Sequence, residues 1–422
     1  MKNYWWKNTV IYEVYVDKFA KNFRGMTEKL DYLKELGIDC IWLLPHYPSP
    51  MVDDGYDVAD YMGVRKDLGT LDDFKVFLAK AHEKGIRVIT DLVLNHVSVE
   101  HPWFIEAAKS LKSPKRGFFL WSKDGNELLS ARSPFRHFVA SHWSYNKATD
   151  DYFFSTYYPQ QVDLNWDNPQ VFEEVLKVID FWAELGVDGF RLDAIAHLIK
   201  REGTECYHRP EIHLILRKIR SHIDKNHSEV ILIAEASGKV EDIIKYFGKG
   251  DECHMVFNFP LMSNIHLAIK RNDMSIIENM LARSSAIPES CQWAIFVNNH
   301  DEITFSPFKE PERDEMITWL DPDGRYSFKG GSGVSMRLAE IFKGDKDKII
   351  NILKILFNLP GSPIVYYGSE IGMRNLDLKE EPVDSRKYVR GEFDWPEAER
   401  QTEDPRSLFN QVTQLIKNKK SQ

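Results

Sequence analysis

The feature that most constrains the fold of this chain is a regular alternation of strand-like and helix-like segments along almost its whole length. Short apolar runs are followed by longer amphipathic runs, and several of these end at a glycine. Such alternation is typical of a parallel sheet whose strands are joined by helices. We expect eight strands, at residues 9–16, 40–44, 87–94, 189–195, 230–236, 254–258, 294–298 and 362–367.

Eight strands that alternate with helices predict a (β/α)8 barrel, the TIM-barrel architecture. The alternation is interrupted after the third strand, where residues 97–168 contain no clean strand-helix pair and are too long for an ordinary loop. We therefore expect a barrel built from residues 1–96 and 169–422, with residues 97–168 forming an inserted lobe.

Composition excludes several classes of protein. The 422 residues are 43% hydrophobic and 28% charged, which is typical of a globular protein, and a net charge of −9 argues against a nucleic-acid partner. Residues 1–7 lack the apolar core of a signal peptide and no apolar run is long enough to cross a membrane, so we expect a cytoplasmic protein without a membrane partner.

Four cysteines, which are isolated in the sequence and have no zinc-like spacing, are expected to be free thiols: Cys40, Cys206, Cys253 and Cys291.

Polar side chains recur at the C-terminal ends of the predicted strands. In a (β/α)8 barrel these ends and their loops face one shared bowl, where reactive groups lie. Three acids that reach one bowl, Asp193, Glu235 and Asp301, suggest glycosidic bond chemistry. In such chemistry one carboxylate attacks the anomeric carbon and a second, protonated carboxyl group releases the leaving oxygen. The strand-end residues are Asp91, Asn95 and His96 on strand three, Arg191, Asp193 and His197 on strand four, Glu235 on strand five, and His300 and Asp301 on strand seven.

Arg191 and Asp193 stand two residues apart in an apolar run, so a strand places both on the same face. A buried charged pair costs free energy unless the two groups pair with each other or take part in chemistry. We expect Arg191 to keep the pKa of Asp193 low, and the Asp193 carboxylate to raise the pKa of Glu235 on the next strand. Each residue alone also has an ordinary structural explanation, such as an ion pair or a satisfied strand-end histidine.

Five sequence motifs occur in a fixed order on these strands. They are DLVLNH at residues 91–96, QVDLN at 161–165, GFRLD at 189–193, IAEA at 233–236 and NHDE at 299–302. With these motifs the sequence resembles the α-amylase family of retaining glycoside hydrolases and transglucosylases, and the resemblance covers almost the whole chain. The second motif has Val where many members of the family have Pro.

The resemblance implies a role for each strand-end residue. Asp193 would be the nucleophile, Glu235 the general acid/base, and Asp301 a third carboxylate that holds sugar hydroxyls. Arg191 would orient Asp193. His96 and His300 would form hydrogen bonds with the sugar unit that is being transferred.

Residues 53–61 look like those of family members that act on short substrates in a closed pocket. By this resemblance, Tyr56 would stack under the terminal sugar, and Asp53 would pair with Arg390 to hold the far hydroxyls of that sugar. Core packing for Tyr56 and a turn carboxylate for Asp53 are the structural alternatives.

A narrower resemblance concerns residues 201–204, 246–254, 259–262 and 291–296, which are similar to those of trehalose synthases. These enzymes interconvert maltose and trehalose through a glucosyl-enzyme. The chain departs from them at His197, where they tend to have an aromatic residue, and at residues 390–395, which read RGEFDW instead of RTPMQW. It also ends too soon for the C-terminal β-sandwich usual in the family, which is expected to be absent.

Three functional hypotheses follow from these patterns. The first is a retaining transglucosylase of the trehalose synthase kind. The second is a hydrolytic α-glucosidase or small-oligosaccharide α-amylase, in which water accepts the glucosyl unit, and a remote third is a catalytically silent sugar-binding subunit. The expected partner is a small α-glucoside, either maltose, trehalose or a short maltooligosaccharide, and a homo-oligomer is also considered.

No organic cofactor is expected, and one metal site is considered. Asn95 and Asp163 offer oxygen ligands that suit calcium, and a calcium ion between them would tie the inserted lobe to the barrel. In many amylases the backbone carbonyl at the position of His197 contributes to such a site. A hydrogen-bonded Asn-Asp bracket without metal is the alternative.

Overall fold

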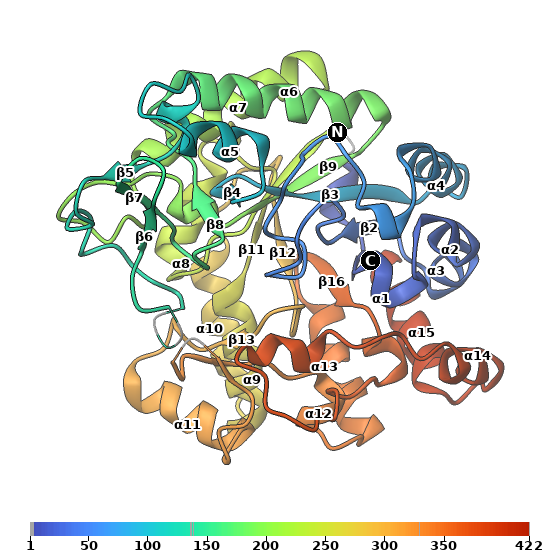
Figure 1. Ribbon diagram of the computed structural model, residues 1–422. Coiled ribbons are helices and arrows are strands. Elements are labelled where there is room, and N and C mark those ends of the chain that lie inside the picture. The colour runs from blue at the N-terminus through green and yellow to red at the C-terminus, as the bar shows by residue number, and fades with distance from the viewer. Residues whose placement is uncertain (1–3, 136, 138, 329, 422) are drawn as a thin grey trace.

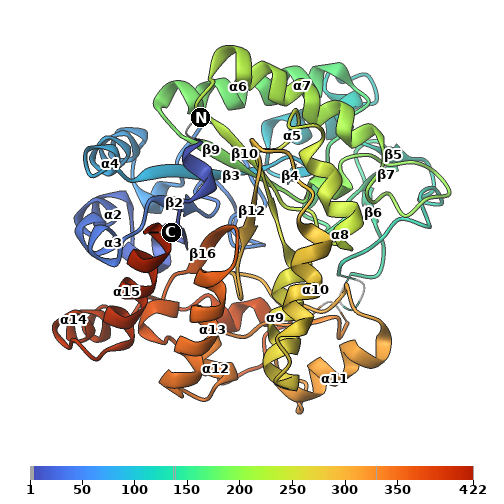
Figure 2. The same cartoon turned by 180° about the vertical axis from the view of Figure 1, so that it is seen from behind.

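The computed structural model describes residues 4–135, 137, 139–328 and 330–421. At its centre eight parallel strands form a closed barrel in the order β1-β16-β12-β11-β10-β9-β3-β2, which confirms the predicted (β/α)8 architecture (Figures 1 and 2). The barrel strands are β1 (Ile11–Val14), β2 (Cys40–Leu43), β3 (Arg87–Val93), β9 (Gly189–Asp193), β10 (Ile231–Ala234), β11 (Met255–Phe257), β12 (Gln292–Ile295) and β16 (Ser362–Tyr366).

Helices surround the barrel on its outside (Figure 1). The longer ones are α4 (Leu71–Glu83), α6 (Pro169–Leu185), α7 (Glu211–Asn226), α9 (Phe259–Arg271), α10 (Ser275–Ser284), α11 (Glu310–Leu320), α13 (Lys346–Asn358) and α15 (Leu408–Lys420). The shorter ones are α1 (Val16–Ala20), α2 (Phe23–Glu28), α3 (Leu30–Leu36), α5 (Pro102–Ala108), α8 (Val240–Ile243), α12 (Leu338–Ile341) and α14 (Trp395–Glu403). Single 3₁₀ turns, such as η7 (Ser385–Val389), connect several of these elements.

Local chemistry explains where the helices begin and end. Thr70 caps α4 in a reciprocal hydrogen-bonded pair with Asp73, and Asn168 caps α6 immediately before Pro169. Helix α6 ends at Gly186, which has the left-handed conformation that favours glycine. One face of α6 is buried and includes Trp182, whose ring packs against His46, Tyr47 and Phe74.

The strands are shorter than the apolar runs that predict them. The run at residues 230–236 contains β10 of four residues, and the run at 294–298 contains only the end of β12, which begins earlier at Gln292. Residues 296–298 stay buried after the ladder ends, because the chain continues through the core toward the loops at the mouth of the barrel. An apolar pattern reports burial, so it cannot separate ladder residues from buried loop residues.

The segment between β3 and α6 carries small antiparallel sheets instead of a strand-helix unit. They are β4-β8 and β5-β7-β6, from β4 (His96–Ser98), β5 (Trp121–Ser122), β6 (Trp143–Asn146), β7 (Asp151–Phe154) and β8 (Gln161–Asp163). A third small sheet follows β12 and comprises β13 (Ile303–Thr304), β14 (Ser327–Phe328) and β15 (Gly333–Val334). Phe135 and Val139 of the first segment pack on Phe328 of the second, so the two excursions meet.

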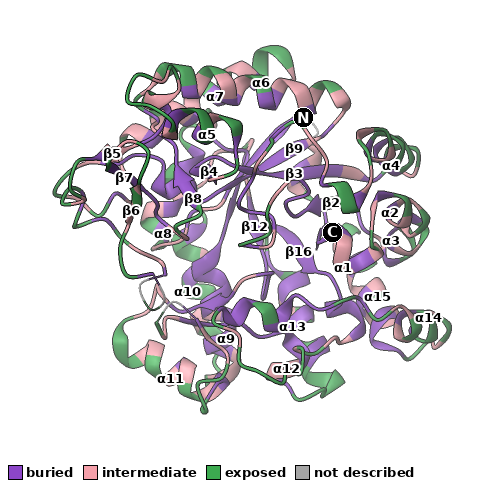
Figure 3. Ribbon diagram, viewed as in Figure 1, coloured by how far each residue is buried: buried purple, intermediate pink, exposed green. Residues whose placement is uncertain are grey.

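Burial is concentrated in the barrel strands, and exposed residues lie on the outer faces of the helices (Figure 3). The four cysteines are buried free thiols, as the sequence predicts. In the described part of the chain no helix is both long and apolar enough to span a membrane.

Gly189 begins β9 at a point where the barrel is very closely packed, which makes it a test of how β9 is held. A Cβ atom there would lie 2.6 Å from Cγ1 of Ile231 and 2.9 Å from Cγ2 of Ile89. We expect Gly189→Ala to destabilise the fold by about 1–3 kcal/mol, because such overpacking displaces neighbouring groups. Thermal unfolding measures this. Gly117→Ala is the control, because the one atom its Cβ would approach is the amide nitrogen of the Asn168 side chain at 3.2 Å. Equal midpoints for the two variants would contradict this assignment.

Candidate active site

One guanidinium group lies at the centre of the carboxyl end of the barrel. Arg191 Nη1 donates hydrogen bonds to Oδ1 of Asp91 at 2.7 Å and to Oδ1 of Asp193 at 2.5 Å. Its Nη2 lies 3.2 Å from Oε2 of Glu235. These three carboxylates come from the neighbouring strands β3, β9 and β10, so a single cation joins the ends of three strands.

The backbone after β9 fixes Glu235 in this group. Ala194 has a positive φ of 50°, which ends the strand, and its N–H donates to Oε2 of Glu235 at 2.7 Å. The N–H of Glu235 donates to the carbonyl of Leu192, so the residue still follows the ladder of β9. Glu235 is thus held by a backbone amide and by Arg191 together.

Burial dominates the electrostatics of these carboxylates. It raises the pKa of Asp193 well above its usual range, Arg191 opposes this, and the neighbouring Glu235 and Asp91 raise the pKa further. Burial likewise raises the pKa of Asp91 to about 6 against the effect of Arg191. The expectation that Arg191 keeps the pKa of Asp193 low is therefore wrong, because one guanidinium is shared by three carboxylates and does not offset their burial.

A buried hydrogen-bond chain supports the site from behind. His300 Nδ1 lies 2.5 Å from Oε1 of Glu13, which also accepts from the His300 backbone N–H. The Nε2 atom of His300 lies 2.7 Å from the hydroxyl of Tyr56, and this hydroxyl lies 3.0 Å from Oδ2 of Asp91. Burial lowers the pKa of His300 well below its usual value, so its imidazole is neutral near pH 7. Sequence reasoning missed Glu13, although a single acid inside the apolar first strand was a signal.

Asp301 is held by two further arginines. Arg390 Nη2 donates to Oδ1 of Asp301 at 2.6 Å, and Arg386 Nη1 donates to the same oxygen at 3.2 Å. Arg390 also donates to Asp54 at 2.6 Å, whereas Arg386 donates to Asp53 at 2.6 Å. The predicted pairing of Asp53 with Arg390 is therefore wrong, since Arg386 occupies that position.

The turn η7 explains this exchange of partners. Asp384 caps the turn and accepts from the Arg386 side chain, which brings that guanidinium beside Asp53. Although burial opposes it, Arg386 holds the pKa of Asp384 below its usual range. Burial raises the pKa of Asp53 to about 6 in spite of the nearby arginines. The Asp-x-Arg spacing of Asp384 and Arg386 was a signal for their pairing, but nothing in the sequence indicated that Arg386 also binds Asp53.

The residues predicted for catalysis and sugar binding meet around one cavity. Its empty space, together with the open mouth, is about 410 Å³. Six predicted residues line it, while Arg191, His300 and Arg390 lie behind and bind the lining carboxylates. The lining comprises Asp53, Tyr56, His96, Asp193, Glu235 and Asp301, together with Phe135, Tyr157, Phe328 and Arg386, which sequence reasoning missed.

A second compartment adjoins this cavity on the side of Glu235. It shares Tyr157 and Glu235 with the first compartment and is bounded by hydroxyl, imidazole and guanidinium groups. The polar residues that line it are Arg132, Ser133, His197, Tyr207, Ser237, Thr304, Ser306 and Ser332. A molecule bound in the first cavity would thus reach Glu235, and the polar second compartment lies beyond Glu235.

Comparison with known proteins places this site in a family context. A model of the alpha amylase catalytic domain matches residues 17–317. The trehalose synthase/amylase TreS of Mycolicibacterium smegmatis is 42% identical over 402 residues, covering 93% of this chain and 67% of that protein. The trehalose synthase of Thermus thermophilus is also 42% identical, over 399 residues, covering 93% of this chain and 40% of that protein.

A solved structure gives the same relationship at the level of fold. The crystal structure of Bacillus licheniformis trehalose-6-phosphate hydrolase (TreA) has a TM-score of 0.76 and 26% sequence identity to this chain. The match covers 100% of this chain and 84% of that one.

The oxygens considered for calcium are held by a lysine. Lys200 Nζ lies 2.7 Å from Oδ1 of Asn95, 2.5 Å from Oδ2 of Asp163 and 2.5 Å from the carbonyl oxygen of His197. The side chains of Lys200 and Asp163 are 2% and 0% exposed. An ammonium group fills the position between these oxygens, so the residues present do not fit a calcium ion there.

The lysine gives a direct test. We expect a calcium chelator to leave the thermal midpoint of the wild-type chain unchanged, because the cation at Asn95 and Asp163 belongs to the protein. Lys200→Ala should destabilise by about 3–5 kcal/mol, since it leaves a buried carboxylate without its partner. Lys75→Ala, which removes a surface partner of Asp72, is the control. A large fall in the wild-type midpoint on chelation would contradict the assignment.

Proposed function

The chain belongs to the α-amylase family, and we propose that it acts on short α-glucosides through a covalent glucosyl-aspartate intermediate. Its reaction is proposed to be that of a retaining transglucosylase of the trehalose synthase kind, which interconverts maltose and trehalose. One observation carries this proposal: carboxylates from three strand ends line a single cavity, and Arg191 contacts two of them, Asp193 and Glu235.

The first step is a displacement at the anomeric carbon of the donor sugar. Asp193 attacks this carbon while the glycosidic C–O bond breaks, and Glu235 gives its proton to the leaving oxygen. A retaining mechanism needs the two carboxyl groups about 5 Å apart, and their common contact with one guanidinium supports a close spacing. Arg191 binds Oδ1 of Asp193, which leaves Oδ2 as the attacking atom.

The second step reverses the first with a new acceptor. A hydroxyl group attacks the same carbon, Glu235 takes its proton, and the bond to Asp193 breaks. Two inversions retain the configuration of the sugar. Both steps use the same pair of side chains in opposite protonation states.

The remaining residues are proposed to hold the sugar ring. Asp301, fixed by two arginines, would accept hydrogen bonds from sugar hydroxyls and favour the oxocarbenium-like state. Burial lowers the pKa of His96 to about 4, so it would offer a neutral imidazole to the sugar. His300 lies behind the lining with Nδ1 on Glu13 and Nε2 on the hydroxyl of Tyr56, so it would position Tyr56 instead of contacting the sugar. The ring of Tyr56 lines the cavity and would pack under the sugar, while the pair of Asp53 with Arg386 would close its far end.

The acceptor distinguishes the proposed activity from a hydrolase. The polar compartment beyond Glu235 supports a sugar acceptor, because a released glucose could stay there and turn before a second transfer. Hydrolysis remains the second candidate, because the structurally similar trehalose-6-phosphate hydrolase shares this fold at 26% identity. The two candidates share the first step and differ only in the second.

The products formed from maltose test the proposed reaction. We expect purified protein given maltose to yield trehalose, read by chromatography, and added isotopically labelled glucose to stay out of that trehalose. Asp193→Asn should lower the rate at least about a thousandfold, because no covalent intermediate can form. Release of glucose alone would show a hydrolase instead, and near wild-type turnover by Asp193→Asn would contradict the nucleophile.

The raised pKa of Asp193 gives a pH prediction. Asp193 must be ionised to attack, so the rate of glucosyl transfer falls as the pH falls through the pKa of Asp193. This acid limb of the pH-rate profile should lie above the usual pKa range of aspartate. Where Glu235 is ionised its negative charge raises this pKa, so Glu235→Gln should move the acid limb to lower pH.

The measurement is fluoride release from α-glucosyl fluoride, whose leaving group needs no proton from Glu235. Glu241→Gln, which changes a surface partner of Arg283, is the matched control and should keep the wild-type profile. An acid limb that stays in place or moves upward in Glu235→Gln would refute the coupling between the two carboxylates.

A further inference from the structure

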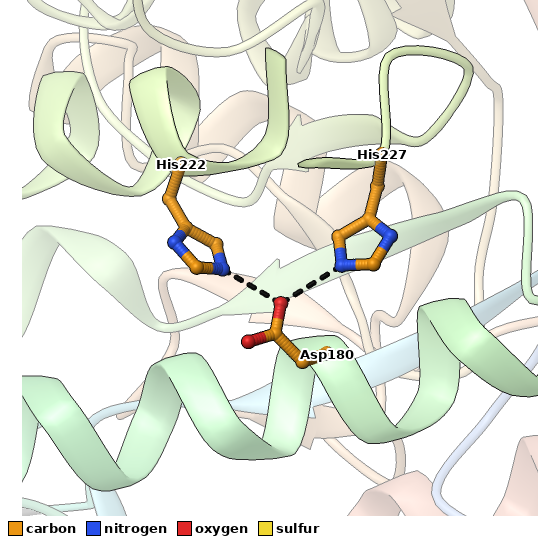
Figure 4. A group of neighbouring side chains, drawn as sticks. All are labelled: Asp180, His222 and His227. Carbon is orange, nitrogen blue, oxygen red and sulfur yellow. Dashed lines mark hydrogen bonds and ion pairs between the residues drawn. The ribbon is translucent and has the colours of Figure 1, made fainter. Parts of the chain in front are cut away.

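A group of three side chains with metal-ligating atoms lies on the helix ring, on elements separate from the strand-end site. Asp180 belongs to α6, His222 to the last turns of α7, and His227 follows α7 directly (Figure 4). The Nε2 atoms of His222 and His227 lie 2.6 and 2.8 Å from the same oxygen, Oδ1 of Asp180. Two imidazoles from one helix end therefore converge on one carboxylate of the neighbouring helix.

The three groups are held by regular structure and are reachable from solvent. The side chains of Asp180, His222 and His227 are 34%, 21% and 14% exposed. The backbone N–H of His227 donates to the carbonyl of Ile223, and its own carbonyl accepts from Val230, which fixes the position just after the helix. Ligands placed by helices keep their geometry better than ligands on free loops.

The charge balance of this cluster differs from that of comparable pairs. Asp188 binds the imidazole of His82 but also Arg87, and Glu252 binds that of His213 but also Arg217. Among the residues described, the ion pairs of Asp180 are those with the two imidazoles. Within the described part of the chain its negative charge has no permanent cationic partner, so no guanidinium there would compete with a metal ion.

We propose that Asp180, His222 and His227 form a binding site for a divalent transition-metal ion of the zinc type. Two imidazole nitrogens, one carboxylate oxygen and a water molecule make the four-coordinate set that zinc accepts. All three ligand atoms already lie within 4.8 Å of one another. Zinc bond lengths of about 2.0–2.2 Å require nitrogen-oxygen separations of about 3.3 Å, so each imidazole nitrogen must lie farther from the Asp180 oxygen in the metal-bound state than it does here.

The group next to His222 suits metal binding through Nε2. When this nitrogen binds a metal, Nδ1 carries the proton and needs an acceptor. The side-chain amide nitrogen of Asn226 lies 3.2 Å from Nδ1 and 3.4 Å from Nε2 of His222, and a flip of the amide places its oxygen within reach of the Nδ1 proton. The cluster thus supplies both the ligands and an outer hydrogen-bond partner.

Metal binding here would join two helices that flank the site-bearing strand. Helix α6 precedes β9 and α7 follows it, so an ion held by both would tie them together without touching the cavity. An ion that binds the folded chain alone raises its unfolding temperature. This inference does not depend on the proposed function.

The test titrates zinc into the 422-residue chain without an affinity tag, after it has been stripped with a chelator. Competition with a chromophoric chelator should show one tight site per chain. His222→Gln and Asp180→Asn should each weaken it at least about tenfold, and the unfolding midpoint should rise with zinc in the wild type only. His82→Gln, which removes an imidazole whose carboxylate partner also has an arginine, should bind as the wild type does.

Cobalt(II) provides the structural readout for the same site. In the wild type it should give the visible absorption of a four-coordinate ion with nitrogen and oxygen ligands, and the double variant His222→Gln/His227→Gln should lose it. Zinc affinity in this double variant equal to that of the wild type would overturn the proposal. So would the absence of binding by the wild type at zinc concentrations well above that of the protein.

Discussion

The site depends on one guanidinium shared by three carboxylates in a buried environment. Arg191 is 2% exposed, and its partners Asp91, Asp193 and Glu235 are 0%, 10% and 21% exposed. Removing charges from water costs several kcal/mol per ion, and one cation cannot compensate three anions. Replacing buried ions by well-packed apolar residues is often stabilising, which supports the proposal that these carboxylates take part in the reaction. The excess of negative charge also raises the pKa values of Asp193 and Asp91.

A second ionic layer closes the cavity and joins parts of the chain that are distant in sequence. Arg386 binds Asp53 and Asp301, and its guanidinium lies 5.1 and 5.0 Å from the ring centres of Phe135 and Phe328. Phe135 comes from the segment after β3, and Phe328 from the sheet after β12. One side chain therefore connects both excursions with the barrel. This closure at one end of the cavity supports the proposal that the substrate is short.

The sequence predicts the barrel and its strand-end acids well, because both follow from local pattern. The alternation of apolar and amphipathic runs places all eight strands, and Asp193 and Glu235 can be identified from their positions at strand ends. The partners of these acids could not be predicted, because they depend on side chains brought together by tertiary structure. Arg386 reaches Asp53 only through the turn η7, and Lys200 meets Asp163 only when the segment after β9 folds against β8. The direction of the pKa shift of Asp193 likewise depends on how many carboxylates share Arg191.

Within this charged cluster Asp193 is proposed to form a covalent bond to the substrate. The most direct test is incubation with a fluorinated glucosyl fluoride whose glycosyl-enzyme turns over slowly, followed by proteolysis and mass spectrometry. We expect the mass of one fluoroglucosyl unit on the peptide that carries Asp193, and fragmentation should place it on that residue. An adduct on another residue, or no adduct while the wild-type protein turns over maltose, would contradict the account.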